Sequence, residues 1–331
     1  MPAQAPITIG LSRRLPEAVT RRLAARFTLL ESDEDRALTA AELADLVARC
    51  DILLPTVTDR IDRAVISAGA AGAGRLRLIA NFGVGVDHID LVAAEELGIA
   101  VSNTPDVLTD ATADLTLALI LMTTRRLGEG ERLLRAGQWR GWAPVDLLGR
   151  GLQGRRLGIV GMGRIGRAVA ARAGAFGLDL HYTGRSRLTG AEAAALGLTW
   201  HDSLAELLPL ADILSLHCPL TERTRGLIGA AELAALPAGA VVINTARGGI
   251  VDEPALAAAL VLGHPAGAGL DVYDGEPRVL PALLDAPGVV TLPHMGSATV
   301  ETRTAMGLRA AANIEAFADG RPLPDAVQPA G

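Results

Sequence analysis

A glycine-rich turn is the first feature of the sequence that indicates chemistry. Gly161, Gly163 and Gly166 follow the apolar run Leu157–Val160 and precede an alanine-rich segment, so the pattern is a strand, a G-x-G-x-x-G turn and a helix. In this context the first glycine permits a tight turn, the second lets a pyrophosphate approach the backbone, and the third lets helix and strand pack closely. Free N–H groups at the start of the helix can bind the phosphates. The pattern predicts a dinucleotide site, and a chance glycine-rich turn in a chain with 37 glycines is the alternative.

The end of the next predicted strand bears on which dinucleotide binds. An Asp or Glu about 20 residues after the glycines normally holds the ribose hydroxyls of NAD. This chain reads Thr183-Gly184-Arg185-Ser186-Arg187 there, and Asp179 lies at the other end of the strand. Without a carboxylate to repel it, a 2′-phosphate can be bound by two guanidinium groups and a hydroxyl. All 31 basic residues are arginine, so a chance arginine is the alternative, and the missing acid is the stronger argument for NADP over NAD.

Further strand ends carry side chains suited to a reducing site, because ligands of a doubly wound sheet bind outside the carboxyl ends of its strands. Arg247 can hold a carboxylate and polarise a neighbouring carbonyl, His294 can deliver a proton, and Glu276 can orient the imidazole and raise its pKa. The structural alternatives are an ion-paired arginine, an acid in the turn before Pro277 and a histidine that caps the last strand. The sequence does not show that the three side chains meet.

The spacing of apolar runs predicts the elements that position these residues. From about residue 157 to residue 292, short apolar runs alternate with Ala/Leu-rich segments, which indicates βα units on a parallel sheet. Six strands, the number in the full doubly wound dinucleotide fold, are predicted at Leu157–Val160, Leu178–Thr183, Asp212–His217, Ala240–Thr245, Gly267–Val272 and Val289–Leu292. Helices are predicted between them at Arg164–Phe176, Ser203–Leu208, Ala230–Leu236 and Glu253–Leu262.

The first hundred residues repeat this pattern on a smaller scale and predict a second α/β domain. Its predicted strands are Ile7–Gly10, Ile52–Pro55, Leu78–Asn81 and Ala100–Asn103. Long helices are predicted at Asp110–Arg125 and Thr299–Phe317, and each could cross between domains. The segment from Gly320 to Pro324 is expected to end the fold.

Length and composition suit a folded protein that binds small molecules. The 331 residues suffice for two domains, and the composition, 50% hydrophobic and 21% charged, predicts order except at the ends. A net charge of −6 argues against a nucleic-acid surface. Cys50 and Cys218 lie in apolar runs, which suits reduced thiols, and no zinc-ligand spacing occurs, so no metal is predicted. The sequence contains neither a leader pattern nor an apolar segment of ~20 residues, so we expect a cytoplasmic protein without a membrane partner.

Motifs along nearly the whole chain resemble those of the D-isomer-specific 2-hydroxyacid dehydrogenases. They are Asn81-Phe82-Gly83-Val84-Gly85-Val86-Asp87-His88-Ile89-Asp90, Asn103-Thr104-Pro105, Leu157 to Gly166, Asn244-Thr245-Ala246-Arg247-Gly248, Leu270-Asp271-Val272-Tyr273 and Pro293-His294. The resemblance implies an α/β protein of two Rossmann-like domains. A doubly wound cofactor domain, residues 103–294, would be inserted into a smaller flavodoxin-like substrate domain, residues 1–102 and 295–331. It also implies a homodimer that uses the helix after Asn103-Thr104-Pro105.

The resemblance assigns site residues as well. It implies that Arg247, Glu276 and His294 are the catalytic residues and that Asp271 contacts the nicotinamide amide. It also implies that the loop from Asn81 through Val84 to Gly85 presents backbone N–H groups to the substrate carboxylate. The expected cofactor contacts are Thr109, Gly161, Gly163, Arg164, Ile165, Gly166, Gly184, Arg185, Ser186, Arg187, His217, Pro219, Thr224, Thr245, Ala246, Arg247, Asp271, His294 and Gly296. His88 is expected to cap a turn rather than to touch substrate.

Within the family the chain resembles the glyoxylate and hydroxypyruvate reductases most, through Thr183-Gly184-Arg185 and the segment His294 to Thr299. Trp142 resembles a tryptophan placed near a neighbouring subunit's substrate, and a surface anchor is the alternative. We therefore predict an NADPH-preferring reductase of small 2-oxo acids that forms D-2-hydroxy acids by hydride transfer, with NAD as a possible cofactor and His294 as general acid. The alternatives are a nicotinamide-sensing protein similar to the C-terminal-binding corepressors and a phosphite or formate oxidoreductase of the same fold.

Overall fold

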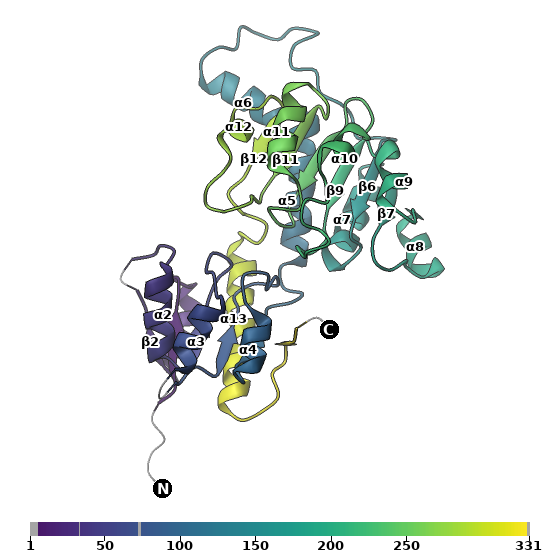
Figure 1. The fold of residues 1–331 in the computed structure, drawn as a ribbon. Helices are drawn as coiled ribbons and strands as arrows, with labels where there is room; N and C mark the ends of the chain where they lie inside the picture. The colour runs from purple at the N-terminus through teal and green to yellow at the C-terminus, as the bar shows by residue number, and fades with distance from the viewer. Residues whose placement is uncertain (1–5, 33, 72–73, 330–331) are drawn as a thin grey trace. The chain divides into compact units, whose positions relative to one another are not determined.

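The structure is a computed structural model that describes residues 6–32, 34–71 and 74–329. The chain divides into two compact units (Figure 1). Unit 1 contains both ends of the chain, Met1–Leu108 and Ala298–Gly331, whereas unit 2 is the continuous segment Thr109–Ser297. The prediction that one α/β domain is inserted into another is therefore confirmed.

Unit 1 is a six-stranded sheet in the order β13-β5-β4-β3-β1-β2, with helices on both faces. Its strands are β1 (Thr8–Leu11), β2 (Thr28–Leu30), β3 (Ile52–Leu54), β4 (Leu78–Ala80), β5 (Ala100–Ser102) and β13 (Ala326–Val327). Its helices are α1 (Glu17–Ala24), α2 (Ala40–Arg49), α3 (Arg63–Ala70), α4 (Leu91–Glu96) and α13 (Val300–Ala318). The strands β1 to β5 are parallel and follow the flavodoxin-like order, as expected.

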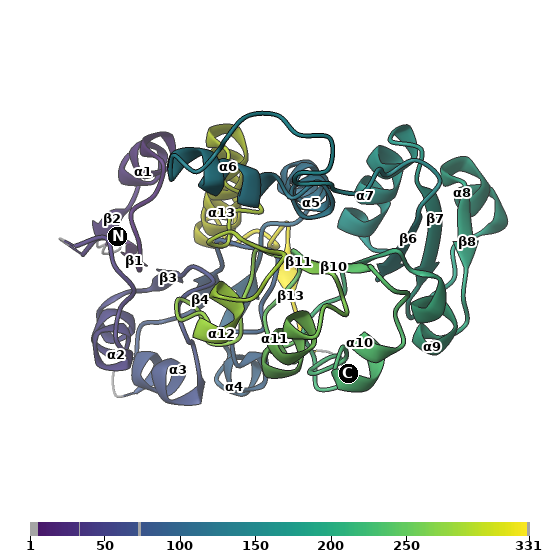
Figure 2. The ribbon, with the colours of Figure 1, turned by 90° about the horizontal axis from the view of Figure 1, so that it is seen from above.

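The helices of unit 1 form one layer on each face of the sheet (Figure 2). The helices α1 and α13 bury Val19, Leu23 and Ile314 against one face, and α2, α3 and α4 bury residues such as Val47 and Ile66 against the other. Because both faces are covered, the central strands consist almost wholly of apolar residues. The apolar runs of the sequence are the consequence of this double burial.

Unit 2 is a seven-stranded parallel sheet in the order β12-β11-β10-β9-β6-β7-β8, which is the doubly wound dinucleotide order with one added strand. Its strands are β6 (Arg156–Val160), β7 (Asp179–Thr183), β8 (Leu198–Trp200), β9 (Ile213–Leu216), β10 (Val241–Asn244), β11 (Gly267–Leu270) and β12 (Val289–Thr291). Its helices are α5 (Thr109–Thr124), α6 (Leu127–Arg135), α7 (Arg164–Ala175), α8 (Gly190–Leu196), α9 (Leu204–Leu207), the 3₁₀ helix η1 (Leu208–Leu210), α10 (Ala230–Ala234), α11 (Glu253–Val261) and α12 (Pro281–Leu284).

Two cores hold unit 2 together, one on each face of its sheet (Figure 2). The helices α5 and α7 bury Ile120 and Val169 against one face together with the fully buried Tyr182. The helices α10 and α11 bury Leu233 and Leu256 against the other face. Within the described residues no helix is both long and apolar enough to span a membrane.

Two predictions about the ends of the units are wrong. Asn103 and Thr104 were placed in the cofactor domain, but their N–H groups donate to the carbonyl oxygens of Asp325 (3.2 Å) and Gly83 (3.0 Å) in unit 1. Residues 295–297 were placed in the substrate domain but belong to unit 2, because the carboxylate of Asp271 accepts the N–H of Gly296 at 2.7 Å. The boundaries therefore fall at 108/109 and 297/298.

The C-terminal segment does not end at residues 320–324 as predicted. The chain continues into β13, which pairs antiparallel with β5 through Ala326 and Ser102. Asp325 anchors this return, because its carboxylate accepts hydrogen bonds from Arg309 at 2.6 Å and from Asn313 at 2.8 Å. A two-residue strand at the edge of a sheet leaves no periodic pattern in the sequence.

Candidate functional site

The carboxyl edge of the sheet of unit 2 gathers most of the predicted site residues. Because the strands are parallel, residues that follow them lie at one edge of the sheet. They are Gly161 after β6, Gly184 after β7, His217 after β9, Thr245 after β10, Asp271 after β11 and His294 after β12.

Each glycine of the turn between β6 and α7 has its own geometric reason. Gly161 has φ 96°, in the left-handed region, and a Cβ there would lie 2.8 Å from the backbone of His217. A Cβ on Gly166 would collide with the carbonyl oxygen of Gly161, so only glycine lets α7 pack this close to β6. A Cβ on Gly163 would meet no atom within 4 Å.

The open side of Gly163 lies at the start of α7, where free N–H groups can bind an anion. Gly163 is the residue that precedes the helix, and Arg164 and Ile165 are the first two residues within it. The turn therefore fits the pyrophosphate of a dinucleotide, with α7 long enough, at 12 residues, to contribute a helix dipole.

The loop after β7 is exposed from Gly184 to Arg187 and contains no acid. An added Cβ on Gly184 would lie 3.7 Å from the Cα atom of Gly161, so this loop runs beside the glycine turn. The hydroxyl of Tyr182 accepts the N–H of Leu188 at 2.9 Å and fixes the far end of the loop. Asp179 is the first residue of β7, at the opposite edge of the sheet, and its carboxylate lies 3.1 Å from Nε2 of His181.

His217 follows β9 and contacts Ser215, whose Oγ lies 2.8 Å from Nε2 of the ring. Although part of the residue reaches the surface, burial of the ring lowers its pKa to about 4, so the imidazole is neutral at pH 7. Pro219 is exposed, and its carbonyl oxygen accepts the hydroxyl of Thr224 at 2.7 Å. The same hydroxyl accepts the N–H of Thr221 at 2.8 Å, so Thr224 braces this loop.

Asn244, the last residue of β10, shapes the loop that carries Arg247. Its Oδ1 accepts the N–H of Ala246 at 3.0 Å, and its Nδ2 donates to the carbonyl oxygen of Arg247 at 2.8 Å. The hydroxyl of Thr245 lies 2.8 Å from that of Thr116 in α5. Sequence reasoning missed the role of Asn244, although a polar residue at the end of a buried Val-Val-Ile strand is a recognisable signal.

His294 and Glu276 form the closest pair of predicted catalytic side chains. Nδ1 of His294 lies 2.7 Å from Oε2 of Glu276, and Oε1 of Glu276 accepts the N–H of Tyr273 at 2.9 Å. Burial alone would raise the pKa of the Glu276 carboxyl, but the hydrogen bond and charge of His294, the N–H of Tyr273 and the charge of Arg247 together lower it. The structure therefore joins His294 and Glu276 directly, and the charge of Arg247, whose Nη1 donates to the carbonyl oxygen of Ala246 at 2.7 Å, helps to keep the Glu276 carboxylate ionised.

The backbone of His294 is held in an unusual conformation by Asp271. His294 has φ 53°, in the left-handed region that non-glycine residues rarely adopt. Its N–H donates to the carbonyl oxygen of Asp271 at 2.9 Å, and the Asp271 carboxylate accepts the N–H groups of Met295 at 2.6 Å and Gly296 at 2.7 Å. The hydroxyl of Thr112 donates to the carbonyl oxygen of Gly296 at 3.2 Å. The carboxylate of Asp271 thus aligns the loop behind His294.

In unit 1 the buried Asn81 shapes the loop that follows β4. Its Nδ2 donates to the carbonyl oxygens of Gly83 (3.0 Å) and Gly85 (2.9 Å), and the side chain of Asn103 donates to that of Val84 (2.9 Å). The loop carbonyls therefore point toward these two asparagines. Among the described residues no backbone hydrogen bond uses the N–H groups of Gly83, Val84 or Gly85.

His88 completes this loop from its other end. Its Nε2 lies 3.1 Å from Oδ1 of Asn81, and its carbonyl oxygen accepts the N–H of Ile61 at 2.8 Å. These contacts agree with the expected role of His88 in a turn. Sequence reasoning did not recognise Asn103 as a second organiser of the loop.

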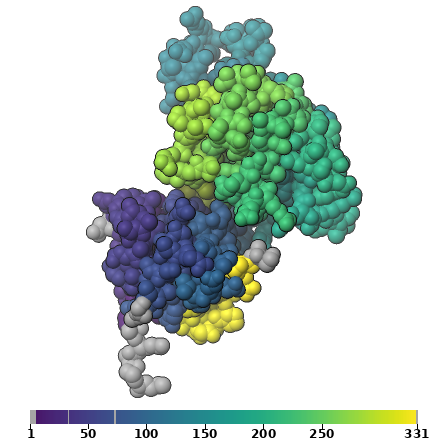
Figure 3. All heavy atoms as spheres, viewed as in Figure 1, coloured from purple at the N-terminus to yellow at the C-terminus, as the bar shows by residue number. Residues whose placement is uncertain are grey.

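The remaining predicted residues lie on α5 and on the segment after α6. Thr109 is the first residue of α5, at the boundary of unit 2. Trp142 is 83% exposed in the long loop of residues 136–152, which stands out from the rest of unit 2 (Figure 3). Neighbouring apolar side chains are exposed as well, namely Leu134, Trp139, Val145 and Leu148.

Comparisons with known proteins identify relatives that match nearly the whole chain. Residues 117–296 match the family model described as D-isomer specific 2-hydroxyacid dehydrogenase, NAD binding domain. A protein named glyoxylate reductase from Thermococcus litoralis is 41% identical over 323 residues, which cover 96% of each chain.

Two solved structures have the same fold over nearly the whole length. A structure from Polaromonas sp. JS6 66 that is assigned to the D-isomer specific 2-hydroxyacid dehydrogenases has a TM-score of 0.90 and 42% identity, covering 98% of this chain and 100% of that one. An NADPH-dependent glyoxylate/hydroxypyruvate reductase from Sinorhizobium meliloti, solved with NADP and malonate, has a TM-score of 0.84 and 36% identity, covering 98% and 97%. The chain therefore belongs, as its motifs predicted, to the D-isomer specific 2-hydroxyacid dehydrogenases, a family of nicotinamide-dependent oxidoreductases, and unit 2 contains the NAD binding domain.

Proposed function

We propose that this protein reduces small 2-oxo acids of the glyoxylate and hydroxypyruvate type to D-2-hydroxy acids, with NADPH as the preferred cofactor and NADH as a weaker one. The observation that carries the proposal is the pair formed by Nδ1 of His294 and Oε2 of Glu276, 2.7 Å apart, next to the charge of Arg247. The relative from Thermococcus litoralis is named glyoxylate reductase, and the relative from Sinorhizobium meliloti is a glyoxylate/hydroxypyruvate reductase.

His294 is the general acid in this proposal. Glu276 occupies Nδ1, so Nε2 is the ring nitrogen that delivers a proton to the carbonyl oxygen of the substrate. The ionised carboxylate of Glu276 binds Nδ1 and keeps the plane of the imidazole ring fixed. When bound, the reduced nicotinamide supplies the hydride that adds to the carbonyl carbon. A proton from His294 and this hydride together convert the carbonyl group to an alcohol.

Arg247 and the loop of Asn81, Val84 and Gly85 bind the carboxylate of the 2-oxo acid in this proposal. A guanidinium group binds a carboxylate through two parallel hydrogen bonds, which also fixes the direction of the adjacent carbonyl. The N–H groups of the loop are suited to binding the same carboxylate. Asn81 and Asn103 hold the loop carbonyls on their side, which leaves the N–H groups for the substrate. The carboxylate of Asp271 would also accept a hydrogen bond from the nicotinamide amide.

The preference for NADPH rests on the loop of Gly184, Arg185, Ser186 and Arg187. A carboxylate at this strand end would repel a 2′-phosphate, and the loop has none. Arg185 and Arg187 are exposed beside the glycine turn, whereas the nearby Arg167 is bound to Glu192 at 2.8 Å. The two loop arginines are therefore the groups available for the phosphate.

The exposed apolar side chains of residues 134–148 support a homodimer. Five large apolar side chains in one short segment are unusual on the surface of a monomer, and a second copy of the chain is the partner that would cover them. Trp142 would then lie near the partner subunit's substrate. Light scattering after size-exclusion chromatography should give twice the mass of the 34.2 kDa chain, and Trp142→Ala should raise KM for the 2-oxo acid. A monomer with wild-type KM in the variant would overturn this part.

A substrate panel with both cofactors tests the central proposal. Glyoxylate, hydroxypyruvate and pyruvate are supplied with NADPH or NADH, and formate and phosphite are supplied with NADP or NAD in the reverse direction. We expect a higher kcat/KM for glyoxylate or hydroxypyruvate with NADPH than with NADH. Turnover of formate or phosphite alone would identify an oxidoreductase of another class, and tight cofactor binding without any turnover would favour a cofactor-sensing protein.

A further inference from the structure

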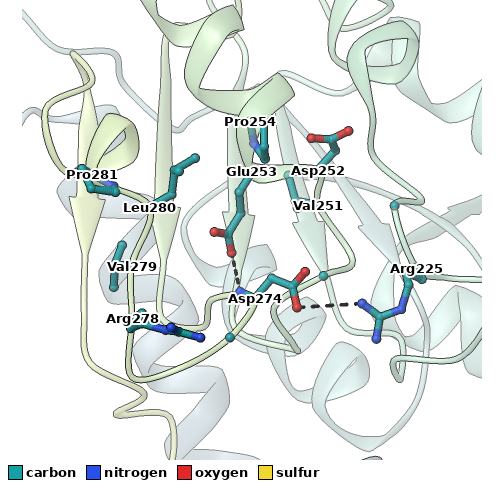
Figure 4. Close-up of a pocket in the computed structure, with 13 residues that line it drawn as sticks. Arg225, Val251, Asp252, Glu253, Pro254, Asp274, Arg278, Val279, Leu280 and Pro281 are labelled. Atoms are coloured by element: carbon teal, nitrogen blue, oxygen red, sulfur yellow. Dashed lines mark hydrogen bonds and ion pairs between the residues drawn. The ribbon is translucent and has the colours of Figure 1, made fainter.

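A surface pocket of unit 2 lies directly beside the loop that carries Glu276. The cavity has a volume of about 760 Å³ and is lined by Arg225, Val251, Glu253, Asp274, Arg278 and Leu280, among others. Figure 4 shows the carboxylate of Glu253 extending from the start of α11 toward the backbone of Asp274. The side chain of Glu253 thus spans the gap between α11 and the Glu276 loop.

Glu253 is a buried acid that makes one short hydrogen bond. Only 8% of the residue is exposed, and its Oε1 accepts the N–H of Asp274 at 2.6 Å. Burial raises the pKa of the Glu253 carboxyl, while this hydrogen bond opposes the rise. Burying a carboxyl group costs free energy that the hydrogen bond must offset. An acid is not needed to start α11, because Asp252 caps the helix by accepting the N–H of Ala255 at 3.0 Å.

The N–H that Glu253 accepts belongs to the peptide group between Tyr273 and Asp274. On another side the same peptide group is packed against Gly248, where a Cβ would collide with the carbonyl carbon of Tyr273. Gly248 directly follows Arg247 in the chain. A single peptide group is therefore held between the loop of Arg247 and the carboxylate of Glu253.

This peptide group is connected to Glu276 through Tyr273, which forms one half of the peptide and also binds the Glu276 carboxylate. The N–H of Tyr273 donates to Oε1 of Glu276 at 2.9 Å, and its hydroxyl donates to the carbonyl oxygens of Leu270 (3.1 Å) and Leu292 (2.9 Å). This N–H belongs to the neighbouring 272–273 peptide, and Glu276 follows Asp274 by two residues. A displacement of the Tyr273–Asp274 peptide would therefore shift the backbone that carries Glu276 away from the N–H of Tyr273. The other oxygen of that carboxylate binds His294.

We propose that Glu253 is a positioning residue for the reaction. Its carboxylate fixes the Tyr273–Asp274 peptide and thereby holds Glu276 against His294 and beside the loop of Arg247. This inference rests on the proposed function in one respect, namely that Glu276 and His294 act in the chemical step. The positional part concerns the loop alone and can be measured without turnover.

Three variants test the proposal. Glu253→Leu keeps much of the buried volume but cannot accept the N–H of Asp274, and Glu253→Gln retains an oxygen that can accept it. Asp252→Ala is the matched control, because it weakens the same end of α11 without touching residues 273–276. Tm is measured for each variant so that kinetics are compared only between folded proteins.

Glu253→Leu should lower kcat for glyoxylate or hydroxypyruvate at least tenfold and leave KM for NADPH within about twofold. Glu253→Gln should retain at least half of kcat. Asp252→Ala should lower Tm while kcat stays unchanged. Wild-type kcat in Glu253→Leu, or an equal loss in Asp252→Ala, would overturn the inference.

Hydrogen exchange followed by mass spectrometry separates this inference from the proposed function. If the wild-type protein binds NADPH but reduces none of the 2-oxo acids, the proposed function fails and exchange decides the positional part. Faster exchange in the peptide that spans residues 270–278 of Glu253→Leu, but not of Asp252→Ala, would support it. Equal exchange in the wild type and Glu253→Leu would reject it. If Glu253→Leu does not fold, the same comparison is made with Glu253→Ala, which likewise cannot accept the N–H of Asp274.

Discussion

Nδ1 of His294 lies 2.7 Å from Oε2 of Glu276, and this contact joins the loops that follow β11 and β12. Because the ionised carboxylate of Glu276 orients the imidazole through Nδ1, Glu276→Gln should lower kcat at least about tenfold.

His294→Gln should lower kcat by about 10²- to 10⁴-fold, the usual contribution of a general acid. The dissociation constant for NADPH, measured by fluorescence titration, should change little in either variant. A wild-type kcat in Glu276→Gln would contradict the assigned role of this carboxylate.

The glycines of the turn should separate stability from cofactor binding. A Cβ on Gly163 meets open space, so Gly163→Ala should leave Tm within about 2 °C while it weakens NADPH binding at the start of α7. A Cβ on Gly166 collides with the carbonyl oxygen of Gly161, so Gly166→Ala should lower Tm. Thermal unfolding and NADPH titration of both variants measure the contrast. Unweakened cofactor binding in Gly163→Ala would place the pyrophosphate elsewhere.

Arg185 and Arg187 should determine the cofactor preference. Replacement of both by Ala removes the groups available for a 2′-phosphate, so kcat/KM for NADPH should fall about tenfold or more while that for NADH changes little. Arg167→Ala is the matched control, since this arginine is bound to Glu192 and lies on the neighbouring helix. Equal losses with both cofactors in the double variant would show that the loop arginines do not recognise the phosphate.

His217 should make the stability of unit 2 depend on pH. Its pKa is about 4 in the folded protein and 6.5 for the free group, so between these values the unfolded chain binds a proton that the folded protein does not. The free energy of unfolding should therefore fall as the pH is lowered through this window, by about 2 kcal/mol between pH 7 and pH 5. His217→Gln should lack this contribution.

Tryptophan fluorescence can follow this unfolding, because all three tryptophans, Trp139, Trp142 and Trp200, lie in unit 2. Denaturant curves of the wild type and of His217→Gln at pH 7 and pH 5 give the free energy of unfolding of each protein. The contribution of His217 is the difference in pH dependence between the two proteins, because all other titrating groups are the same in both. Identical pH dependence in the two proteins would show that the imidazole takes up its proton at the same pH in the folded and unfolded states.

The structure contains all the strands predicted for both units, within a few residues at their ends. Most of these strands are largely apolar because helices bury both faces of each sheet, and such apolar runs can be recognised in the sequence without tertiary information. The strands that were missed, β2, β8 and β13, are two or three residues long and lie at or near sheet edges. These short strands are defined by pairing with strands elsewhere in the chain, so they leave no periodic pattern in the local sequence.

The functional site, like the fold, could be predicted from the sequence only in part. Strand ends and glycine spacing indicated Gly161, Arg247, Glu276 and His294, because parallel strands present their ends at one edge of a sheet. Two residues that hold functional loops in place escaped prediction, because they act through backbone atoms of other segments. Asn103 binds the loop of Val84, and Glu253 binds the loop that leads to Glu276. A side chain that binds a distant peptide group has no fixed sequence offset from it.

The sequence by itself determined the family, the dinucleotide turn and the types of side chain at the strand ends, because these depend on local patterns of glycine, apolar and polar residues. Only the tertiary structure decided that Glu276 meets His294 at 2.7 Å, that Asp271 holds His294 at φ 53°, and where the two units divide. Those outcomes depend on the packing of segments far apart in the chain, which fixes distances that no local pattern contains.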